Sequence, residues 1–449
     1  MKEKICLITP PSPFLLDERV FLHLGILKVA SALELEGYRV DALDLSGIEN
    51  FLDVVDNYIE LNKDEESLVF GITATTPQVP YAVKIGALIR ERCNAKTILG
   101  GPHCTLMNTA AKREKKKNYE KSDRATRDVE RLKSYFDVLV CGDGERAILD
   151  ALALDSGVVD ADNRKSPYFL SNDDFSTLPP PARHLVDMES YHYSIEGEKA
   201  TSLIAQLGCP FHCTFCSGRN SPFLRKIRTR STESIIDEME HLYLNYGMKG
   251  FMFYDDELNV NKSMVSMMHQ ICDLQDKHGV DFMLRGFVKA ELFNDEQAAA
   301  MYKAGFRWLL TGFESGDERI LKNIKKIATR EDNTRAVEIA KRNNLKVKAL
   351  MSIGHAGESA ESVNNTKEWL LQVEPEDFDC SIITTYPGSP YFDDAERCGD
   401  HYVYTDRKNG DKLYQANLDY LVDQDYYKGD PSGGYLSYVW TDHLSALEI

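Results

Sequence analysis

Short apolar runs alternate with amphipathic helical stretches along most of this chain, and that alternation constrains the fold more than any other feature. Within the first 150 residues the predicted strands lie at 5–9, 39–43, 67–73, 96–99 and 138–141, with predicted helices at 22–36 and 81–92. Strands that are separated by helices pair in parallel. The pattern therefore predicts an α/β, doubly wound (Rossmann-like) domain with helices on both faces of its sheet.

The same alternation resumes after residue 200. Strands are predicted at 202–206, 250–254, 282–287, 308–312, 346–352 and 378–384, and helices at 233–246, 264–277, 295–303, 330–343 and 361–372. Six such units fit a partial (β/α)6 barrel of the TIM type. We expect a doubly wound domain over 1–158, a polar linker over 159–198, the partial barrel over 199–392 and a small, tyrosine-rich C-terminal cap over 393–449.

Charge and cysteine content narrow the possible functions. The chain has 53 Lys and Arg against 71 Asp and Glu, a net charge of −18, which argues against a protein that grips nucleic acid phosphates. No stretch has the roughly 20 apolar residues that a membrane span needs. Ten scattered cysteines with a single tight cluster do not form the pattern of a disulfide scaffold. We therefore expect reduced thiols and a cytoplasmic location.

The most charged stretch lies between residues 112 and 133, where ten side chains are basic and five are acidic. A composition of this kind is typical of a solvated helix or a disordered excursion. A specific anion-binding arm is the alternative.

The cysteine cluster follows the first predicted strand of the barrel, within the run Gly-Cys-Pro-Phe-His-Cys-Thr-Phe-Cys at 208–216. The thiolates of Cys209, Cys213 and Cys216 can hold three irons of a [4Fe-4S] cluster and leave the fourth iron open to a small molecule. Structural zinc and three unrelated buried cysteines are the alternatives. Zinc normally takes four protein ligands in a closed site, and a second cysteine pair is missing.

The spacing Cys-x-x-x-Cys-x-x-Cys at the first strand of a partial barrel resembles the radical S-adenosylmethionine (SAM) superfamily. In that family the amino and carboxylate groups of SAM chelate the open iron, and one electron into the sulfonium yields a 5′-deoxyadenosyl radical. The cofactor carries the chemistry, while the protein supplies position and exclusion of water. The resemblance also implies a one-electron donor such as flavodoxin or ferredoxin.

Segments at further strand ends fit the same family and cover most of residues 201–390. Each segment also has an alternative interpretation when it is taken singly. The acidic pair at 255–256 is also typical of a helix N-cap, and the Gly-Phe-Glu-Ser-Gly run at 312–316 is also typical of a turn. Arg285 suits either a structural salt bridge or a bidentate contact with a carboxylate. The residues that the resemblance implies around SAM are Phe215, Asp255, Asp256, Arg285, Glu314, Ser315 and Gly357.

The strand-end loops of the first domain resemble the cobalamin-binding domain that precedes the barrel in one large radical SAM subfamily. Ligands of doubly wound sheets bind at the carboxyl ends of the strands, although glycines there also suit ordinary turns. The Asp-x-His-x-x-Gly segment that supplies an axial histidine in many cobalamin proteins is absent. If cobalamin binds, the implied residues are Thr9, Pro10, Thr75, Thr76, Gly100, Gly101, Pro102, His103, Gly142, Gly144 and Glu145.

The resemblance implies methylation of an unactivated carbon of a small-molecule or natural-product substrate. Without cobalamin the same scaffold suits radical dehydration, epimerisation or cyclisation, with Tyr386 and Cys380 as candidates to exchange a proton or hydrogen atom. A tRNA methylthiotransferase would be expected to carry three extra N-terminal cysteines and a basic C-terminal module. A non-catalytic Fe–S protein would leave the barrel motifs unexplained.

Overall fold

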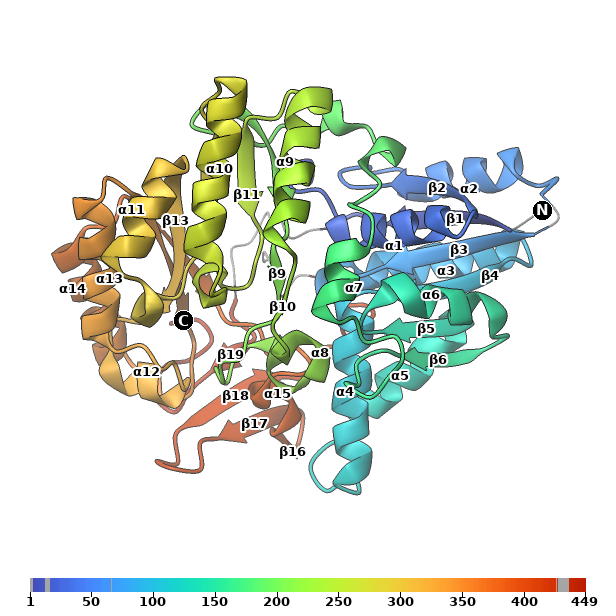
Figure 1. Ribbon diagram of the computed structural model, residues 1–449. Coiled ribbons are helices and arrows are strands. Elements are labelled where there is room, and N and C mark those ends of the chain that lie inside the picture. The colour runs from blue at the N-terminus through green and yellow to red at the C-terminus, as the bar shows by residue number, and fades with distance from the viewer. Residues whose placement is uncertain (1–2, 13–16, 66, 425, 427–435) are drawn as a thin grey trace.

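The computed structural model describes residues 3–12, 17–65, 67–424, 426 and 436–449. The first domain is built on a parallel sheet in the order β2-β1-β3-β4-β5-β6 (Figure 1). Its strands are β1 (Lys4–Thr9), β2 (Arg39–Asp44), β3 (Leu68–Thr73), β4 (Lys96–Gly100), β5 (Val138–Cys141) and β6 (Gly157–Asp160). The strand order reverses between β1 and β3, and ligands of such sheets bind at this switch point. The predicted α/β doubly wound fold is confirmed.

Alternate residues of each strand pack on opposite faces of this sheet. Ile5 and Leu7 of β1 join the core beneath α1 (Leu24–Leu35) and α6 (Gly144–Ala153). Cys6 and Ile8 join the core on the other face, as the two-residue repeat of a strand requires. That face is covered by α2 (Phe51–Leu61), α3 (Val79–Arg92), α4 (Pro102–Lys116) and α5 (Arg124–Tyr135).

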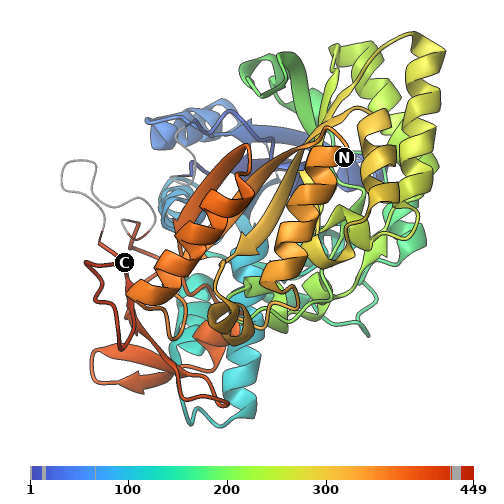
Figure 2. The same ribbon diagram turned by 90° about the vertical axis from the view of Figure 1, so that its left-hand side faces the viewer.

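The second sheet has the order β15-β14-β13-β12-β11-β8-β7 and curls into an open partial barrel (Figure 2). Its parallel strands are β8 (Glu198–Leu203), β11 (Gly250–Phe253), β12 (Met283–Phe287), β13 (Phe306–Glu314), β14 (Lys346–Ile353) and β15 (Asp377–Ile382), with β7 (Ser194–Ile195) antiparallel at one edge. The helices of this part are α8 (Pro222–Arg225), α9 (Thr232–Tyr246), α10 (Met264–His278), α11 (Asp295–Lys303), α12 (Glu318–Asn323), α13 (Arg330–Arg342) and α14 (Ala360–Val373).

The first barrel strand ends earlier than the predicted strand at 202–206. The carboxylate of Asp255 accepts the backbone N–H groups of Ala205 (2.7 Å) and Gln206 (3.0 Å), so these groups cannot continue the ladder. After this point a short strand β9 (Gln206–Leu207) pairs with β10 (Arg228–Thr229) in antiparallel fashion. The cysteine loop therefore connects β9 to β10, two short strands that pair with each other.

The stretch that was expected as a linker over 159–198 carries several elements of its own. Strand β6 runs to Asp160, helix α7 covers Asn172–Thr177, and β7 and the first residue of β8 also fall within this stretch. Helix α7 begins with a capping box, in which Ser171 and Asp174 satisfy each other's backbone N–H groups.

The last part of the chain forms a four-stranded antiparallel sheet below the barrel. It follows α15 (Pro390–Asp393) and consists of β16 (Glu396–Cys398), β17 (His401–Thr405), β18 (Lys412–Ala416) and β19 (Val439–Trp440). The rings of Tyr414 and Trp440 stack across it with centroids 5.8 Å apart. We call this unit the C-terminal sheet.

The charged stretch at 112–133 is helical with many exposed side chains, which agrees with the solvated helix of the expectation and not with a disordered excursion. It forms the end of α4, a tight turn and most of α5, and the pair projects towards the C-terminal sheet (Figures 1 and 2). Glu114 is buried because its carboxylate accepts the N–H groups of Ala125 and Thr126 at the start of α5. The guanidinium of Arg124 lies between two rings, 3.5 Å from the centroid of Phe392 and 4.0 Å from that of Tyr402.

Candidate functional site

The cysteine loop is fixed by backbone contacts on both sides. Gly208 has φ +90°, and a Cβ there would lie 2.2 Å from the carbonyl oxygen of Lys226, so only glycine fits. The N–H of Cys209 donates to Leu224 (2.9 Å) and that of Thr214 donates to Ile324 (2.9 Å). Cys209, Cys213 and Cys216 are all free thiols. Three thiols are thus held on one short loop at the carboxyl end of the barrel.

A single metal ion has no ready site within the described ranges. No three His, Cys, Asp or Glu side chains among these residues converge closely enough to hold one ion. Burial raises the pKa of Cys209 to about 12, so its thiol is neutral until a metal supplies positive charge.

Buried charges surround the cysteine loop. Lys326 donates to Glu314 (3.3 Å), and Lys289 pairs with Glu291 (3.1 Å) while its Nζ lies 4.5 Å from the ring of Phe211. Burial raises the pKa of Glu257 to about 7, and both lysines act against that rise. Both lysines lie outside the sequence motifs that indicate the site.

The acidic pair after β11 supports the loop from below. Besides its contacts with Ala205 and Gln206, Asp255 has one carboxylate oxygen that is buried without a hydrogen-bond partner among the described residues. Burial raises its pKa to about 7, although the two backbone N–H groups act in the opposite direction. Asp256 accepts the N–H of Gly208 (2.9 Å). Both acids therefore position the residue that begins the cysteine loop.

Phe215 lies beside a polar network at the ends of β13 and β14. Its ring centroid is 5.4 Å from that of His355. His355 contacts Ser352 through Nε2 (2.7 Å), and the Ser352 hydroxyl also lies 2.7 Å from Glu314. Glu314 adopts φ +67°, which turns its carboxylate towards Lys326. These side chains connect the last cysteines to the barrel strands.

Three other residues that the resemblance placed around SAM have different surroundings. Ser315 is buried, shares a hydrogen bond with Thr366 (3.0 Å) and accepts the N–H of Asp317 (3.1 Å). Gly357 has φ +81° and lies against the loop of the C-terminal sheet, where a Cβ would meet Asp411 at 2.5 Å. Arg285 lies deeper in the barrel, with its guanidinium 5.9 Å from the centroid of Trp308.

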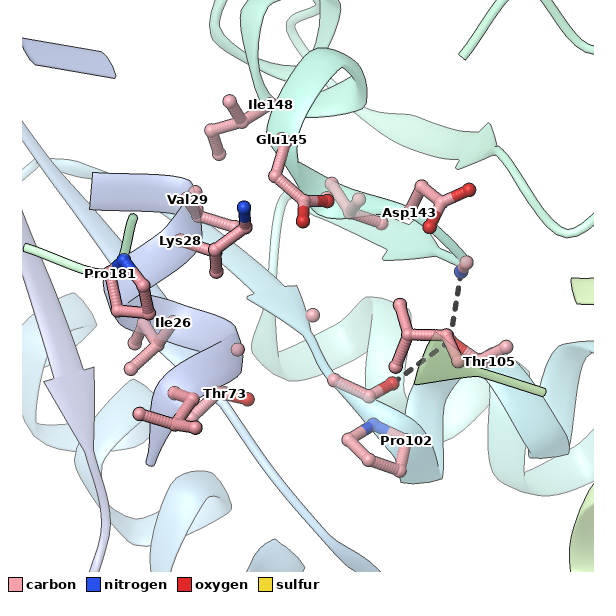
Figure 3. Close-up of a pocket in the computed structure, with 18 of the residues that line it drawn as sticks. Ile26, Lys28, Val29, Thr73, Pro102, Thr105, Asp143, Glu145, Ile148 and Pro181 are labelled. Carbon is pink, nitrogen blue, oxygen red and sulfur yellow. Dashed lines mark hydrogen bonds between the residues drawn. The ribbon is translucent and has the colours of Figure 1, made fainter. Parts of the chain in front are cut away.

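The strand-end loops of the first domain border two joined cavities. One, of about 340 Å³, lies between the sheet, α1, α6 and the start of the barrel (Figure 3). The other, of about 490 Å³, lies between the strand ends and the barrel and is lined by Ser202, Tyr254 and Tyr386 among others. They share lining residues that include Gly25 and Thr73. We call them the tail cavity and the mouth cavity.

The tail cavity is largely apolar and has glycines at its wall. A Cβ on Gly25 would meet nothing within 4 Å, and one on Gly100 would meet only Val140, at 3.8 and 3.9 Å. Lys28 of α1 and Glu145 of α6 face each other across the cavity (Figure 3). Burial lowers the pKa of Lys28, and the charge of Glu145 acts against that change.

Most of the residues expected around cobalamin line these cavities. They are Gly100, Gly101, Pro102, Gly142, Gly144 and Glu145 in the tail cavity and Thr75, Thr76 and Pro102 in the mouth cavity. Thr9, Pro10 and His103 line neither. His103 is fully buried beside Thr76 (3.1 Å), and burial lowers its pKa to about 3. Among the described residues, His23, which sequence reasoning missed, is the only histidine that lines either cavity.

The two candidates for proton or hydrogen-atom exchange lie in different places. Tyr386 lines the mouth cavity, whereas Cys380 is exposed on the edge strand β15 and lines neither cavity. The described part of the chain also holds no helix that is long and apolar enough to span a membrane.

Comparisons with known proteins agree with this geometry. Residues 203–370 match the family model for the radical SAM superfamily. An uncharacterized methyltransferase of Pyrococcus horikoshii is 29% identical over 86% of this chain and 82% of its own length. The anaerobic magnesium-protoporphyrin IX monomethyl ester cyclase of Cereibacter sphaeroides is 24% identical over 79% of this chain and 59% of its own length.

A solved structure shows the same arrangement over the whole chain. The radical SAM methyltransferase TsrM of Kitasatospora setae, with cobalamin and a [4Fe-4S] cluster bound, superposes with a TM-score of 0.70 at 15% identity, covering 98% of this chain and 88% of that one. At this identity the likeness concerns the fold. The family match over residues 203–370 and the cysteine loop within it indicate a radical SAM domain, and the likeness to TsrM shows that the chain shares the fold of that enzyme.

Proposed function

We propose that this enzyme methylates an unactivated carbon of a small-molecule substrate and that it uses a [4Fe-4S] cluster, SAM and cobalamin. The observation that carries the proposal is the joined pair of cavities between the two sheets. The tail cavity has room because Gly25 and Gly100 lack side chains, and the mouth cavity lies between the strand ends and the barrel interior. A corrinoid needs both kinds of space, one for its tail and one for its ring.

The residues of the cysteine loop fit a cluster with one open iron. Cys209, Cys213 and Cys216 would hold it, and Phe215 would lie beside the bound SAM. When bound, the cluster would supply one electron to the sulfonium of SAM, and cobalamin would supply the methyl group. An electron donor such as flavodoxin or ferredoxin belongs to the same proposal. So does a cytoplasmic location, because a thiolate-bound cluster needs a reducing compartment.

The buried charges around the loop suit the amino-acid end of SAM. Glu257 becomes a carboxylate more readily when a cation lies beside it, and the ammonium group of SAM is such a cation. The Nζ of Lys289 lies over the ring of Phe211, which belongs to the cysteine loop. From this position Lys289 can face the carboxylate of SAM. Both groups would then orient SAM without taking part in bond cleavage.

The mouth cavity also indicates how cobalamin would be held. His103 is buried away from the cavity, and His23 lies at its margin among the charges of Asp44 and Arg19. The strand-end loops therefore offer no axial histidine of the usual kind, and we expect the base-off form.

Because the Cereibacter sphaeroides relative is a cyclase, radical cyclisation is the second candidate, with Tyr386 at the cavity wall as its supporting observation.

The test uses protein made in cells supplied with cobalamin, with its cluster reconstituted anaerobically. We expect close to one base-off corrinoid per chain. Reduced flavodoxin and SAM should give 5′-deoxyadenosine together with S-adenosylhomocysteine. Protein that cleaves SAM through an intact cluster but carries no corrinoid would exclude methyl transfer and leave cyclisation, dehydration or epimerisation.

A further inference from the structure

The interior of the barrel holds polar groups that none of the cofactors uses. Ser202 Oγ and Arg285 Nε are buried and have no hydrogen-bond partner among the described residues. Ser202 is 3% exposed, and the buried phenol of Tyr193 interacts with the side chain of Arg285. A buried polar group without a partner is unfavourable unless something binds it. Ser202 Oγ and Arg285 Nε therefore call for a ligand.

The strand register places these groups on one face of the sheet. Ser202 of β8 pairs with Met252 of β11, and Met252 pairs with Arg285 of β12. Laterally paired residues of neighbouring strands project to the same face. Since Ser202 lines the mouth cavity, Arg285 projects from the same inner face of the barrel.

Arg285 lies too deep to serve the cysteine loop. It is the third residue of β12, and Lys289, which lies over Phe211 of the loop, comes four residues later. β12 ends at Phe287, so Arg285 lies within the strand and Lys289 lies two residues beyond its end. We therefore assign the two cations to different ligands. Lys289 lies near SAM, and Arg285 lies on the floor of the barrel.

Arg285 is a cation without a carboxylate partner in the described structure, where no ion pair within 4 Å includes it. The neighbouring cation Lys348 is already paired with Asp377 and Asp379, at 2.9 Å each. Burial raises the pKa of Tyr193, and the charge of Arg285 and a hydrogen bond with it act against that rise. Asp377 interacts with Arg285 only at longer range than an ion pair, so the guanidinium can take a carboxylate partner.

Aromatic rings form the wall between this floor and the mouth cavity. Phe21 lies 4.9 Å from Tyr193 and 5.5 Å from Tyr254, and Tyr254 lies 6.2 Å from Phe287, measured between ring centroids. Phe21 belongs to the first domain and Tyr254 is 45% exposed. The wall is therefore open on the side of the mouth cavity and contains residues from both domains.

We propose that Arg285 binds the carboxylate of the substrate, and that the substrate is a carboxylic acid whose apolar, planar body lies against Phe21, Tyr254 and Phe287. The fork of the guanidinium suits a bidentate carboxylate, and the hydroxyls of Tyr193 and Ser202 line the same floor. A monoanion fits better than a dianion, because the charge of Asp377 also acts on Arg285. This inference rests on the proposed function, since it names the substrate class of the same site.

The test measures binding of chosen probes to the reconstituted holoenzyme in the presence of SAM, by calorimetry. The probes are 3-phenylpropionate and indole-3-propionate, each compared with its methyl ester, and 2-phenylethylphosphonate as a dianion. We expect each acid to bind at least tenfold more tightly than its ester. Arg285→Gln should remove that preference without weakening the ester, and Arg285→Lys should retain part of it.

Arg307→Gln is the matched control, because Arg307 lies in β13 but stacks on Tyr302 (4.7 Å) outside the barrel interior. It should leave the preference unchanged, and cluster and corrinoid contents should be the same in all variants. Acids that bind no better than esters, a preference that survives Arg285→Gln, or tighter binding of the phosphonate would each overturn the inference. If the preference is found but no methyl transfer occurs, the proposed function fails and this inference stands.

Discussion

Replacement of Gly100 by leucine should remove corrinoid from the enzyme without unfolding it. Gly100 ends β4 and lines the tail cavity. Its φ is not in the left-handed region, and a Cβ there would have ordinary contacts with Val140, at 3.8 and 3.9 Å. The leucine side chain therefore enters the cavity rather than the surrounding structure.

The same substitution should change stability and affinity in opposite directions. Burial of a leucine side chain in a largely apolar space contributes about 1.5–3 kcal/mol, and loss of glycine's freedom in the unfolded chain adds about 0.4–1 kcal/mol. Protein without corrinoid should therefore be at least as stable as the wild type. A cofactor that must share the cavity meets an overpacked site, which costs about 1–3 kcal/mol, or about 5- to 140-fold in Kd.

The assay compares corrinoid per chain, from visible absorption, with the unfolding midpoint of the corrinoid-free protein. Gly100→Ala is the size control and should retain most of the corrinoid. Gly101→Leu is the contrasting variant, because φ is +96° there and a Cβ would lie 2.8 Å from the backbone nitrogen of Ala74, so the fold itself should weaken. Gly100→Leu protein that still binds corrinoid with wild-type affinity would refute the placement of the tail.

Two other predictions concern the cluster and a buried acid. Cys213→Ala should lose the [4Fe-4S] centre and form no 5′-deoxyadenosine, and iron analysis with electron paramagnetic resonance would detect an unexpected full cluster. Burial raises the pKa of Asp128 from 3.8 to about 6, and Asp419 adds to that rise. Its contribution to stability should therefore be complete below pH 3.8 and disappear as the pH rises through 6, a change of at most about 3 kcal/mol. Asp128→Asn should be more stable than the wild type at pH 7.5 but not at pH 3.8 by urea unfolding, and the exposed Asp123→Asn should show no such difference.

The strand–helix alternation predicted both sheets well because its signals are local. Helix α11 begins and ends at the predicted residues, since Asn294 accepts the N–H of Gln297 at its start and the apolar repeat stops at Lys303. The end of the first barrel strand was misplaced because the carboxylate of Asp255, in the loop after β11, ends it. For the charged stretch at 112–133, composition suggested a helix but not its packing. Arg124 has its partners Phe392 and Gln415 more than 250 residues away, where local composition gives no indication of them.

The site was predicted in outline, and its details depend on depth and packing. Strand-end reasoning led to the glycines that line the tail cavity, because every parallel strand ends at the same edge. Motif matching could not show what each side chain contacts, as with Ser315, whose hydroxyl accepts the N–H of Asp317. It also could not tell how far down a strand Arg285 lies, which depends on the register of neighbouring strands. Lys289 was overlooked because it lies outside the motifs.

The contact between α5 and the C-terminal sheet bears on the order in which the enzyme is assembled. The tail cavity is lined by residues between 7 and 238, all of which are synthesised before the C-terminal sheet. Arg124 of the first domain is made well before Phe392 and Tyr402, the two rings on which its guanidinium packs. The residues that line the tail cavity are therefore all made before the strands that pack on Arg124. That contact can form only after those strands have been made, because it joins segments more than 250 residues apart.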